Sequence, residues 1–262
     1  MSRYLRVYRE FIRSSFRREM EFRINFIGKL AQNVIWMGFF VLMILVIYSN
    51  VESVAGWTRG DAYVLAATSF LLLSVVNMLF TFNLLEIPQK VRQGTLDFDL
   101  VKPLDTQFLV SVRKFNFDEI GTLFAGIGMA ILGVSLSGHH PSGMEIIEYI
   151  FLLLCAMSIF YSFDLTLMTL AVWLVRVENL WALSDQILGL TRVPIDVYAP
   201  PWRRLLTFYI PLAFLASVPA KALIGEGNIT LVLWGVVWAL GSLIASRFFF
   251  LFAMKRYHSA SS

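Results

Sequence analysis

Three histidines and a single cysteine are the residues of this chain that most often serve as bases, nucleophiles or metal ligands. His139 and His140 are adjacent, His258 lies near the C-terminus, and Cys155 stands inside an apolar run. No serine or cysteine accompanies a histidine in a local motif, so the pattern does not favour a hydrolase. His139 and His140 could bind a metal ion, but no third ligand is evident and a solvated loop is favoured. We therefore expect no catalytic residue and no metal site.

The sequence also lacks the glycine-rich motifs that hold nucleotides. It contains no G-x-x-x-x-G-K-[ST] phosphate loop and no Rossmann glycine fingerprint. Its basic residues are not interleaved with aromatic residues in the manner of a nucleic-acid-binding patch. We expect a chain that is not an enzyme, carries no cofactor of its own and binds no nucleic acid.

Asp164 is an ionisable residue in an unusual position, near the middle of the apolar sequence SIFYSFDLTLMTL. An ionised aspartate at the centre of a bilayer costs roughly 2.5–3.5 kcal/mol, so Asp164 should face protein or water. Tyr161, one helical turn earlier, is a candidate hydrogen-bond partner. Two interpretations stay open: Asp164 lines a substrate path or gate, or it makes a contact between helices. Asn77 belongs to the same candidate set, with an interhelical hydrogen bond as its favoured role.

A polar, turn-rich segment, VRQGTLDFDLVKPLD (residues 91–105), interrupts the apolar sequence. Pro88 suits the first turn of a short helix and Gly94 suits its end, which predicts about two turns over residues 88–93. Asp105 can cap a second helix over residues 106–114. Short capped helices joined by turns indicate a rigid knob that another protein can grip, rather than a solvated linker.

The composition places these features in a membrane protein. The chain has 262 residues, of which 58% are hydrophobic and 15% are charged, against roughly 25% charged residues in soluble domains. Runs of about 20 apolar residues cross a bilayer as helices. We expect one all-α integral membrane domain over residues 1–262 with six transmembrane helices, five of which are assigned directly, to residues 26–48, 62–82, 118–136, 146–175 and 231–254.

Two positions are open for the remaining helix, the fifth in order. Hydropathy favours residues 205–224, although Pro211 and Pro219 each remove a helical hydrogen bond. The alternative places the fifth span at about residues 179–198. The segment 203–226 then enters the membrane and returns, which requires that protein or water cover its backbone.

The first 25 residues predict an amphipathic helix that lies in the membrane interface. Apolar side chains recur at helical spacing on one side. Basic residues recur on the other side, among them Arg6, Arg9, Arg13 and Arg17.

Lysine and arginine gather in the N-terminal segment, in the loop 83–117 and in the C-terminal tail. By the positive-inside rule all three are cytoplasmic. We expect a multi-pass protein with both termini in the cytoplasm and with direct contact to the lipid bilayer.

Two stretches resemble the signatures of one family, a group of bacterial ABC transporter permeases of the type-two exporter class with six helices. RQGTLDFDLVKPL (residues 92–104) is similar to the G-x-(L/F)-D-x-x-L-x-(K/R)-P signature that follows their second span. VPIDVYAPPWRRLLTFYIPLAFLASVPAKAL (residues 193–223) is similar to their second signature, in which a Pro and a Tyr-Pro turn precede IPLAF and a PA pair. Ala199 separates the usual Tyr-Pro here. The resemblance covers nearly the whole chain.

The resemblance implies a location, partners and roles for particular residues. The location is the bacterial inner membrane. The loop after the second span would contribute a coupling helix that sits in a cleft of a separate ATPase, and ATP and Mg would bind in that partner. Two ATPase subunits and a second permease, usually different but identical in some members, would complete the transporter. The segment with Pro211 and Pro219 would be re-entrant on the outer face. The coupling residues would be Pro88, Gln89, Lys90, Val91, Arg92, Gln93, Gly94, Asp97, Lys102 and Pro103.

The first hypothesis is therefore the membrane subunit of an ATP-driven exporter, in which the ATPase subunits push on the knob and the second and third spans relay the motion. The rival is a secondary transporter or channel that runs on an ion gradient through Asp164. A membrane scaffold without transport is a third, weaker option. A proton relay would need a chain of acids, and the sequence shows one central ionisable residue. An apolar cavity suits lipids, drugs, peptides and polysaccharides alike.

Overall fold

The all-α membrane fold predicted from the sequence is confirmed. The computed structural model describes residues 2–21, 23–174 and 180–257, which form helices joined by turns, with an isolated bridge between Val54 and Trp57. Within those ranges, five helical runs are long and apolar enough to cross a membrane: Ile27–Tyr48, Arg59–Gln93, Phe117–Ser137, Gly143–Val172 and Ile229–Arg256. They match the five spans assigned directly, except that Val175 lies outside the described residues. The sixth span stays a prediction.

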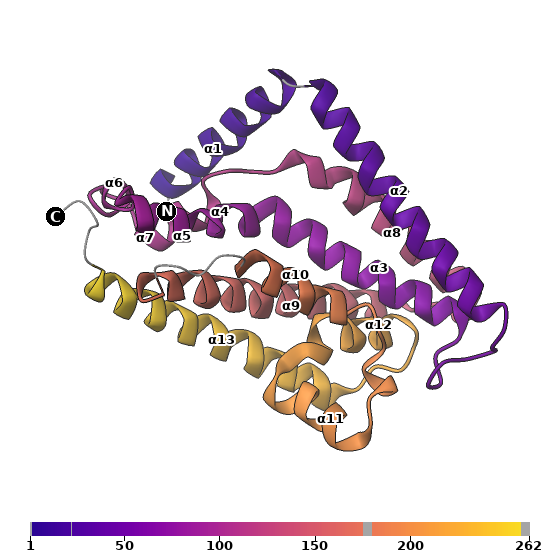
Figure 1. Ribbon diagram of the computed structural model, residues 1–262. Coiled ribbons are helices and arrows are strands. Elements are labelled where there is room, and N and C mark those ends of the chain that lie inside the picture. Colours follow the sequence, from indigo (N-terminus) through magenta and orange to yellow (C-terminus); the bar gives the residue numbers. More distant parts are fainter. Residues whose placement is uncertain (1, 22, 175–179, 258–262) are drawn as a thin grey trace.

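Helix α3 (Arg59–Val76) is the centre of the bundle (Figure 1). On one side it packs along α8 (Ile120–Ser137) and α2 (Arg23–Tyr48), and on the other side lie α9 (Gly143–Thr169) and α13 (Ile229–Arg256). Two-thirds of the apolar window of the α3 run is buried, against about a tenth for α2. Most of α2 therefore stays available to lipid or to another protein.

Glycines allow α3 and α8 to approach each other closely. A Cβ atom on Gly133 of α8 would lie 2.7 Å from the backbone nitrogen of Val64, and one on Gly60 of α3 would lie 2.3 Å from the nitrogen of Ser137. Real side chains do not tolerate either contact. Small residues at helix crossings are the usual means of tight packing in membranes, where lipid removes the hydrophobic driving force.

The region between α9 and α13 contains no described helix that could span a bilayer. Helix α10 (Leu180–Leu190) has 11 residues, about half of the 20 that a crossing requires. Of the two positions left open for the fifth span, the regular helix over residues 205–224 that hydropathy favours is wrong. That stretch is a π-helix (Leu205–Tyr209), a 3₁₀ turn (Pro211–Leu215) and α12 (Ser217–Leu223), because Pro211 forces the break at Ile210.

The alternative fifth span begins at residue 179, which lies outside the described residues, and the chain leaves helical geometry after Leu190. Pro219 lies in the first turn of α12, where a missing N–H removes no helical hydrogen bond, and both prolines belong to a compact group of short helices with α11 (Pro200–Arg204). Whether this group re-enters the membrane stays a prediction.

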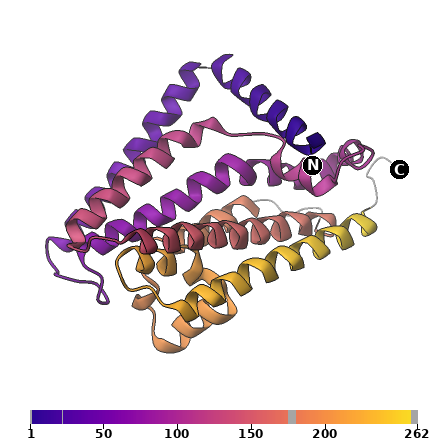
Figure 2. The same cartoon turned by 180° about the vertical axis from the view of Figure 1, so that it is seen from behind.

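The N-terminal amphipathic helix is present as α1 (Ser2–Glu21). Its arginines Arg6, Arg9, Arg13 and Arg17 are all exposed. Part of its apolar side packs on the segment that precedes α8: Tyr4 meets Phe108 edge-on at 5.0 Å, and Phe16 meets Phe117 at 5.4 Å. These ring contacts place α1 beside the loop 83–117 (Figure 2).

Candidate functional site

Three short helices form a compact structure at the end of the bundle where α1 begins and α13 ends (Figure 1). They are α5 (Glu86–Gln93), α6 (Asp97–Leu100) and α7 (Thr106–Val112), and we call this structure the knob. The predicted helix at Pro88 is confirmed, with Gly94 ending it at a left-handed φ of 68°. The predicted cap is also confirmed, since Asp105 accepts a 3.0 Å hydrogen bond from the nitrogen of Phe108. Helix α7 ends two residues earlier than expected, at Val112.

A buried carboxylate organises the knob. Asp99 is 2% exposed and lies within ion-pair distance of three cations, Lys102 at 2.7 Å, Lys90 at 3.0 Å and Arg113 at 3.5 Å. Burial by itself raises the pKa of Asp99, but the hydrogen bonds and charges of Lys102 and Lys90 outweigh it, so the pKa lies below its ordinary value. Sequence reasoning named Lys90 and Lys102 and missed Asp99, although it stands two residues after Asp97 within the same signature.

The tip of the knob presents apolar side chains to its surroundings. Phe98 is 69% exposed and Val101 is 80% exposed, on either side of the buried Asp99. Arg92 is exposed nearby in sequence, at the end of α5. An exposed aromatic side chain held by a rigid local structure is typical of a protein-binding surface. The sequence signal that could have identified these residues is the alternation of acidic and apolar residues in DFDL, followed by Val101.

The predicted coupling residues divide into three groups by burial. Val91 and Gly94 are buried and serve the interior of the knob, whereas Pro88, Lys90, Asp97 and Lys102 are partly buried. The residues of the set that are open to a partner are Gln89, Arg92, Gln93 and Pro103.

The base of the knob belongs to the core of the bundle. Ile87, Leu96 and Val110 are at most 1% exposed and share a cluster with Leu165 of α9 and Phe250 of α13. Sequence reasoning placed the relay in the second and third spans. The structure adds α9 and α13 to the elements that a displacement of the knob would reach.

Hydrogen bonds join the two ends of the loop 83–117. The side chain of Asn83 donates to the carbonyl of Lys114 at 2.8 Å and accepts from the nitrogen of the same residue at 2.7 Å. Lys114 also forms an ion pair with Glu86 at the start of α5. Asn77 donates to Glu119 at 3.3 Å, a hydrogen bond between the second and third spans. The loop therefore leaves and re-enters the bundle at adjacent points.

Asp164 faces protein, as predicted, and is 1% exposed. Its partners are Ser184 of α10 at 2.5 Å and Thr81 at 3.2 Å, where the α3 run becomes a π-helix (Asn77–Thr81). The expected hydrogen bond to Tyr161 is wrong. The Tyr161 hydroxyl instead contacts Gln107 at 2.9 Å and Ser111 at 2.8 Å on α7, so each of the two side chains has its partners on other helices.

The end of the bundle opposite the knob carries a second charged cluster. Asp196 accepts from the indole nitrogen of Trp57 at 3.0 Å and pairs with Lys221 at 2.8 Å and Arg203 at 3.5 Å. These contacts join α11 and α12, the short helices on either side of Pro211, to the loop that follows α2. Arg203 therefore has a structural role at this end of the bundle.

The residues considered for metal binding do not form a cluster in the part of the chain that the structure describes, where no group of three or more ligand-type side chains occurs. His139 lies 3.3 Å from Glu145. Cys155 is buried in the core. His258 lies outside the described residues.

The first of the two signatures on which the family resemblance rests, residues 92–104, lies in the knob between the second and third spans. The sequence model described as ABC-2 family transporter protein matches residues 34–261. The chain belongs to the ABC-2 transporter family. No curated protein and no solved structure matches it. As an ABC-2 membrane protein it is a permease subunit of an ABC transporter, a multi-pass transport component whose family implies an ABC ATPase as partner. The match begins inside α2, so α1 lies outside it.

Proposed function

We propose that this ABC-2 permease is the membrane subunit of an ATP-driven exporter and that a separate ATPase grips the knob. The observation that carries the proposal is the Asp99 cluster, which holds Phe98 and Val101 exposed on a rigid structure. A coupling element has to transmit force. A flexible loop without such a cluster would deform under the force and would not move the membrane helices. Binding energy at protein interfaces concentrates on a few aromatic and arginine side chains, which Phe98 and Arg92 supply.

Contacts of the knob support a route for the motion. The helical run that starts with α3 continues through the π-helix Asn77–Thr81 and α4 (Phe82–Leu84) into α5, so a push on the knob would act on the central helix. The apolar base of the knob and the hydrogen bonds of Tyr161 add α9, and Phe250 adds α13. The displacement would thus reach both halves of the bundle rather than the second and third spans alone.

The remaining partners follow from the same proposal. Two ATPase subunits would bind one knob each, with ATP and Mg in the ATPase. The second knob would come from a second permease, identical or different. The largely uncovered helix α2 supports such a partner, since 11% of its apolar window is buried. We place the knob and both termini in the cytoplasm and the protein in the bacterial inner membrane, on the distribution of lysine and arginine.

The experiment is to purify the tagged permease from its native membrane and to test nucleotide-dependent transport in reconstituted vesicles. An ATPase with a phosphate loop should co-elute with the wild-type chain. Phe98→Ala and Val101→Asp should reduce co-elution at least about tenfold, the ratio that one buried hot-spot side chain supplies. Arg92→Glu and Asp97→Asn should uncouple ATP hydrolysis from transport.

Val51→Asp is the matched control, because Val51 is an exposed valine in the loop between α2 and α3. Val51→Asp should leave both the co-elution of the ATPase and the coupling of ATP hydrolysis to transport unchanged. Transport by the purified permease without nucleotide would refute the proposal and favour the rival, an ion-gradient transporter. In that case Asp164→Asn should abolish transport, whereas an Asp164 that only joins helices should tolerate the change.

A further inference from the structure

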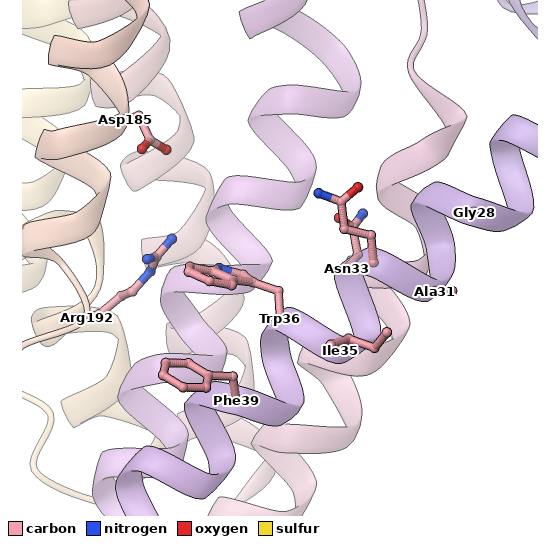
Figure 3. Close-up of a pocket in the computed structure, with 9 residues that line it drawn as sticks. Gly28, Ala31, Asn33, Ile35, Trp36, Phe39, Asp185 and Arg192 are labelled. Carbon is pink, nitrogen blue, oxygen red and sulfur yellow. The ribbon is translucent and has the colours of Figure 1, made fainter.

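A cavity of about 830 Å³ lies between α2 and α10, and the function proposed above does not explain its lining (Figure 3). One wall carries Asp185 on α10 and Arg192 just beyond that helix. The opposite wall is α2, which contributes Asn33, Trp36 and Phe39. The close-up shows the ring of Trp36 turned toward Arg192 across the space. The cavity therefore combines charged and aromatic walls.

Arg192 is held beside the central helix α3, at a depth that follows from its contacts with that helix. Ser69 of α3 donates to the carbonyl of Thr191 at 3.0 Å and contacts the Thr191 hydroxyl at 3.1 Å, which fixes the backbone beside Arg192 to the central helix. Its guanidinium lies 5.3 Å from the ring of Phe70 and 4.8 Å from the ring of Phe40. Phe70 follows the first residue of α3 by 11 positions, a rise of about 16 Å, roughly half of the 30 Å hydrocarbon thickness.

The charge of Arg192 is only partly compensated by its neighbours. Among the described residues no carboxylate lies within ion-pair distance of it; Asp185 attracts it from farther away and is itself exposed. The two ring contacts stabilise a cation but leave hydrogen-bond donors of the guanidinium facing the cavity. An arginine at this depth is costly unless an anion or water meets it.

The α2 wall suits a hydrocarbon chain. Trp36 and Phe39 are about half exposed along the cavity, and Ile35 is 73% exposed beside them. Asn33 and its neighbour Gln32 add polar groups nearer the start of α2. A ligand that satisfies both walls needs one anionic head and one apolar chain.

We propose that this cavity binds an anionic amphiphile as the cargo of the transporter, with Arg192 holding a phosphate or carboxylate head and Trp36 and Phe39 contacting the alkyl chain. The proposal rests on the proposed function, because it names the substrate class of the same transporter. Charge complementarity also weighs against a second protein as the occupant. An apolar helix packed into the cavity would bury the guanidinium without an anion, which is strongly unfavourable.

Fluorescence quenching of Trp36 tests the proposal at equilibrium. The full chain, with the subunits that co-purify, is placed in phosphatidylcholine nanodiscs without nucleotide, and the signal of Trp36 is obtained by difference from Trp36→Phe. Dibromostearate should quench this signal saturably, whereas its uncharged methyl ester should not. Arg192→Gln should weaken the binding of dibromostearate at least about tenfold, the effect of losing one charge-assisted hydrogen bond, and Arg192→Lys should restore part of it.

Arg59→Gln is the control, since Arg59 is exposed at the first turn of α3. It should bind like the wild type. If Arg192→Gln does not fold, Ala31→Phe, which enlarges a lining residue of the α2 wall and adds no tryptophan to the signal, should abolish saturable quenching. Equal quenching by the ester, or displacement of dibromostearate by millimolar inorganic phosphate alone, would overturn the proposal in favour of bulk lipid or of a small-anion site.

A Trp36 signal that neither probe quenches would also overturn it, because a second copy of the chain would then cover the cavity. The assay needs no ATP, so its outcome is independent of the co-elution and coupling measurements above. If dibromostearate binds but ATP hydrolysis is not coupled to transport, only the exporter mechanism is contradicted. If ATP hydrolysis is coupled to transport but dibromostearate does not bind, only the proposal of an anionic amphiphile is contradicted.

Discussion

Arg247 of α13 forms a bidentate ion pair with Asp105, the residue that caps α7 in the knob. Nη2 lies 2.6 Å from Oδ2 and Nη1 lies 3.1 Å from Oδ1. The main-chain nitrogen of Asp105 also donates to the hydroxyl of Tyr4 on α1 at 3.3 Å. One aspartate thus ties the knob to the last membrane helix and to the N-terminal helix.

Replacement of Asp105 should separate its two roles. Asp105→Ala loses the cap and the ion pair and should lower the free energy of unfolding by about 1–2 kcal/mol. Asp105→Asn keeps a capping oxygen, so its loss of unfolding free energy should be less than half of the loss in Asp105→Ala. Thermal unfolding in detergent measures both. Thr106→Ser, at the next position, should leave the free energy of unfolding unchanged. Equal losses for Asn and Ala would show that the charge, not the cap, stabilises this site.

Asp99 should be the least replaceable polar residue of the knob. Asp99→Asn removes the nearer carboxylate of Lys90, which is largely buried and keeps its ion pair with Glu86 at 3.4 Å. The loss of such a charged hydrogen bond costs about 2 kcal/mol. The loop 94–104 should then be cut by protease at low concentration, as seen by peptide mapping. Asp97→Asn, at a partly exposed position two residues earlier, should stay resistant.

The same carboxylate predicts acid sensitivity of the knob. The pKa of Asp99 is lowered in the folded state, so its stabilisation is fully present above about pH 4, the ordinary value, and is lost as the pH falls toward the lower folded value. Protease resistance that stays constant down to pH 3 would contradict the central role of Asp99.

Glu19 should make the attachment of α1 depend on pH in the opposite direction. A hydrogen bond with Asp118, burial and the Asp118 charge raise the pKa of Glu19 to about 7, against the effects of Lys29 and Arg18. The folded state then binds more protons than the unfolded state between about pH 4.5 and 7, so stability falls as the pH rises through that window. Amide exchange of residues 10–21, corrected for its intrinsic pH dependence, should accelerate from pH 5.5 to 8.

Glu19→Gln should remove this pH dependence and keep α1 protected at pH 8. Glu10→Gln, on the exposed side of the same helix, should behave like the wild type. Identical pH profiles for the two variants would exclude Glu19 as the titrating group.

Two glycines of α8 should respond differently to the same substitution. Gly133→Ala places a Cβ against the backbone of Val64, which cannot move aside, and should cost about 1–3 kcal/mol. Gly128→Ala meets nothing within 4 Å and should be neutral or slightly stabilising in a helix. Thermal unfolding in the same detergent compares the two variants. A neutral Gly133→Ala would show that α3 and α8 can separate without loss.

The sequence by itself determined the class of the protein, five of its spans and the local structure of the knob. These features depend on short-range physics: apolar runs long enough for a bilayer, the αL preference of Gly94 and the capping preference of Asp105. The two family signatures added the permease assignment, which the family match confirms.

Only the tertiary structure decided the partners of charged residues that lie far apart in the chain. Asp105 and Arg247 are 142 positions apart, and Asp164 pairs with Ser184 rather than with Tyr161 one turn away. Periodicity reports which face of a helix a residue occupies, but not which helix meets that face. Hydropathy also suggested a regular span over residues 205–224, where the structure has short helices. An average of apolarity does not register the backbone break that Pro211 imposes at Ile210.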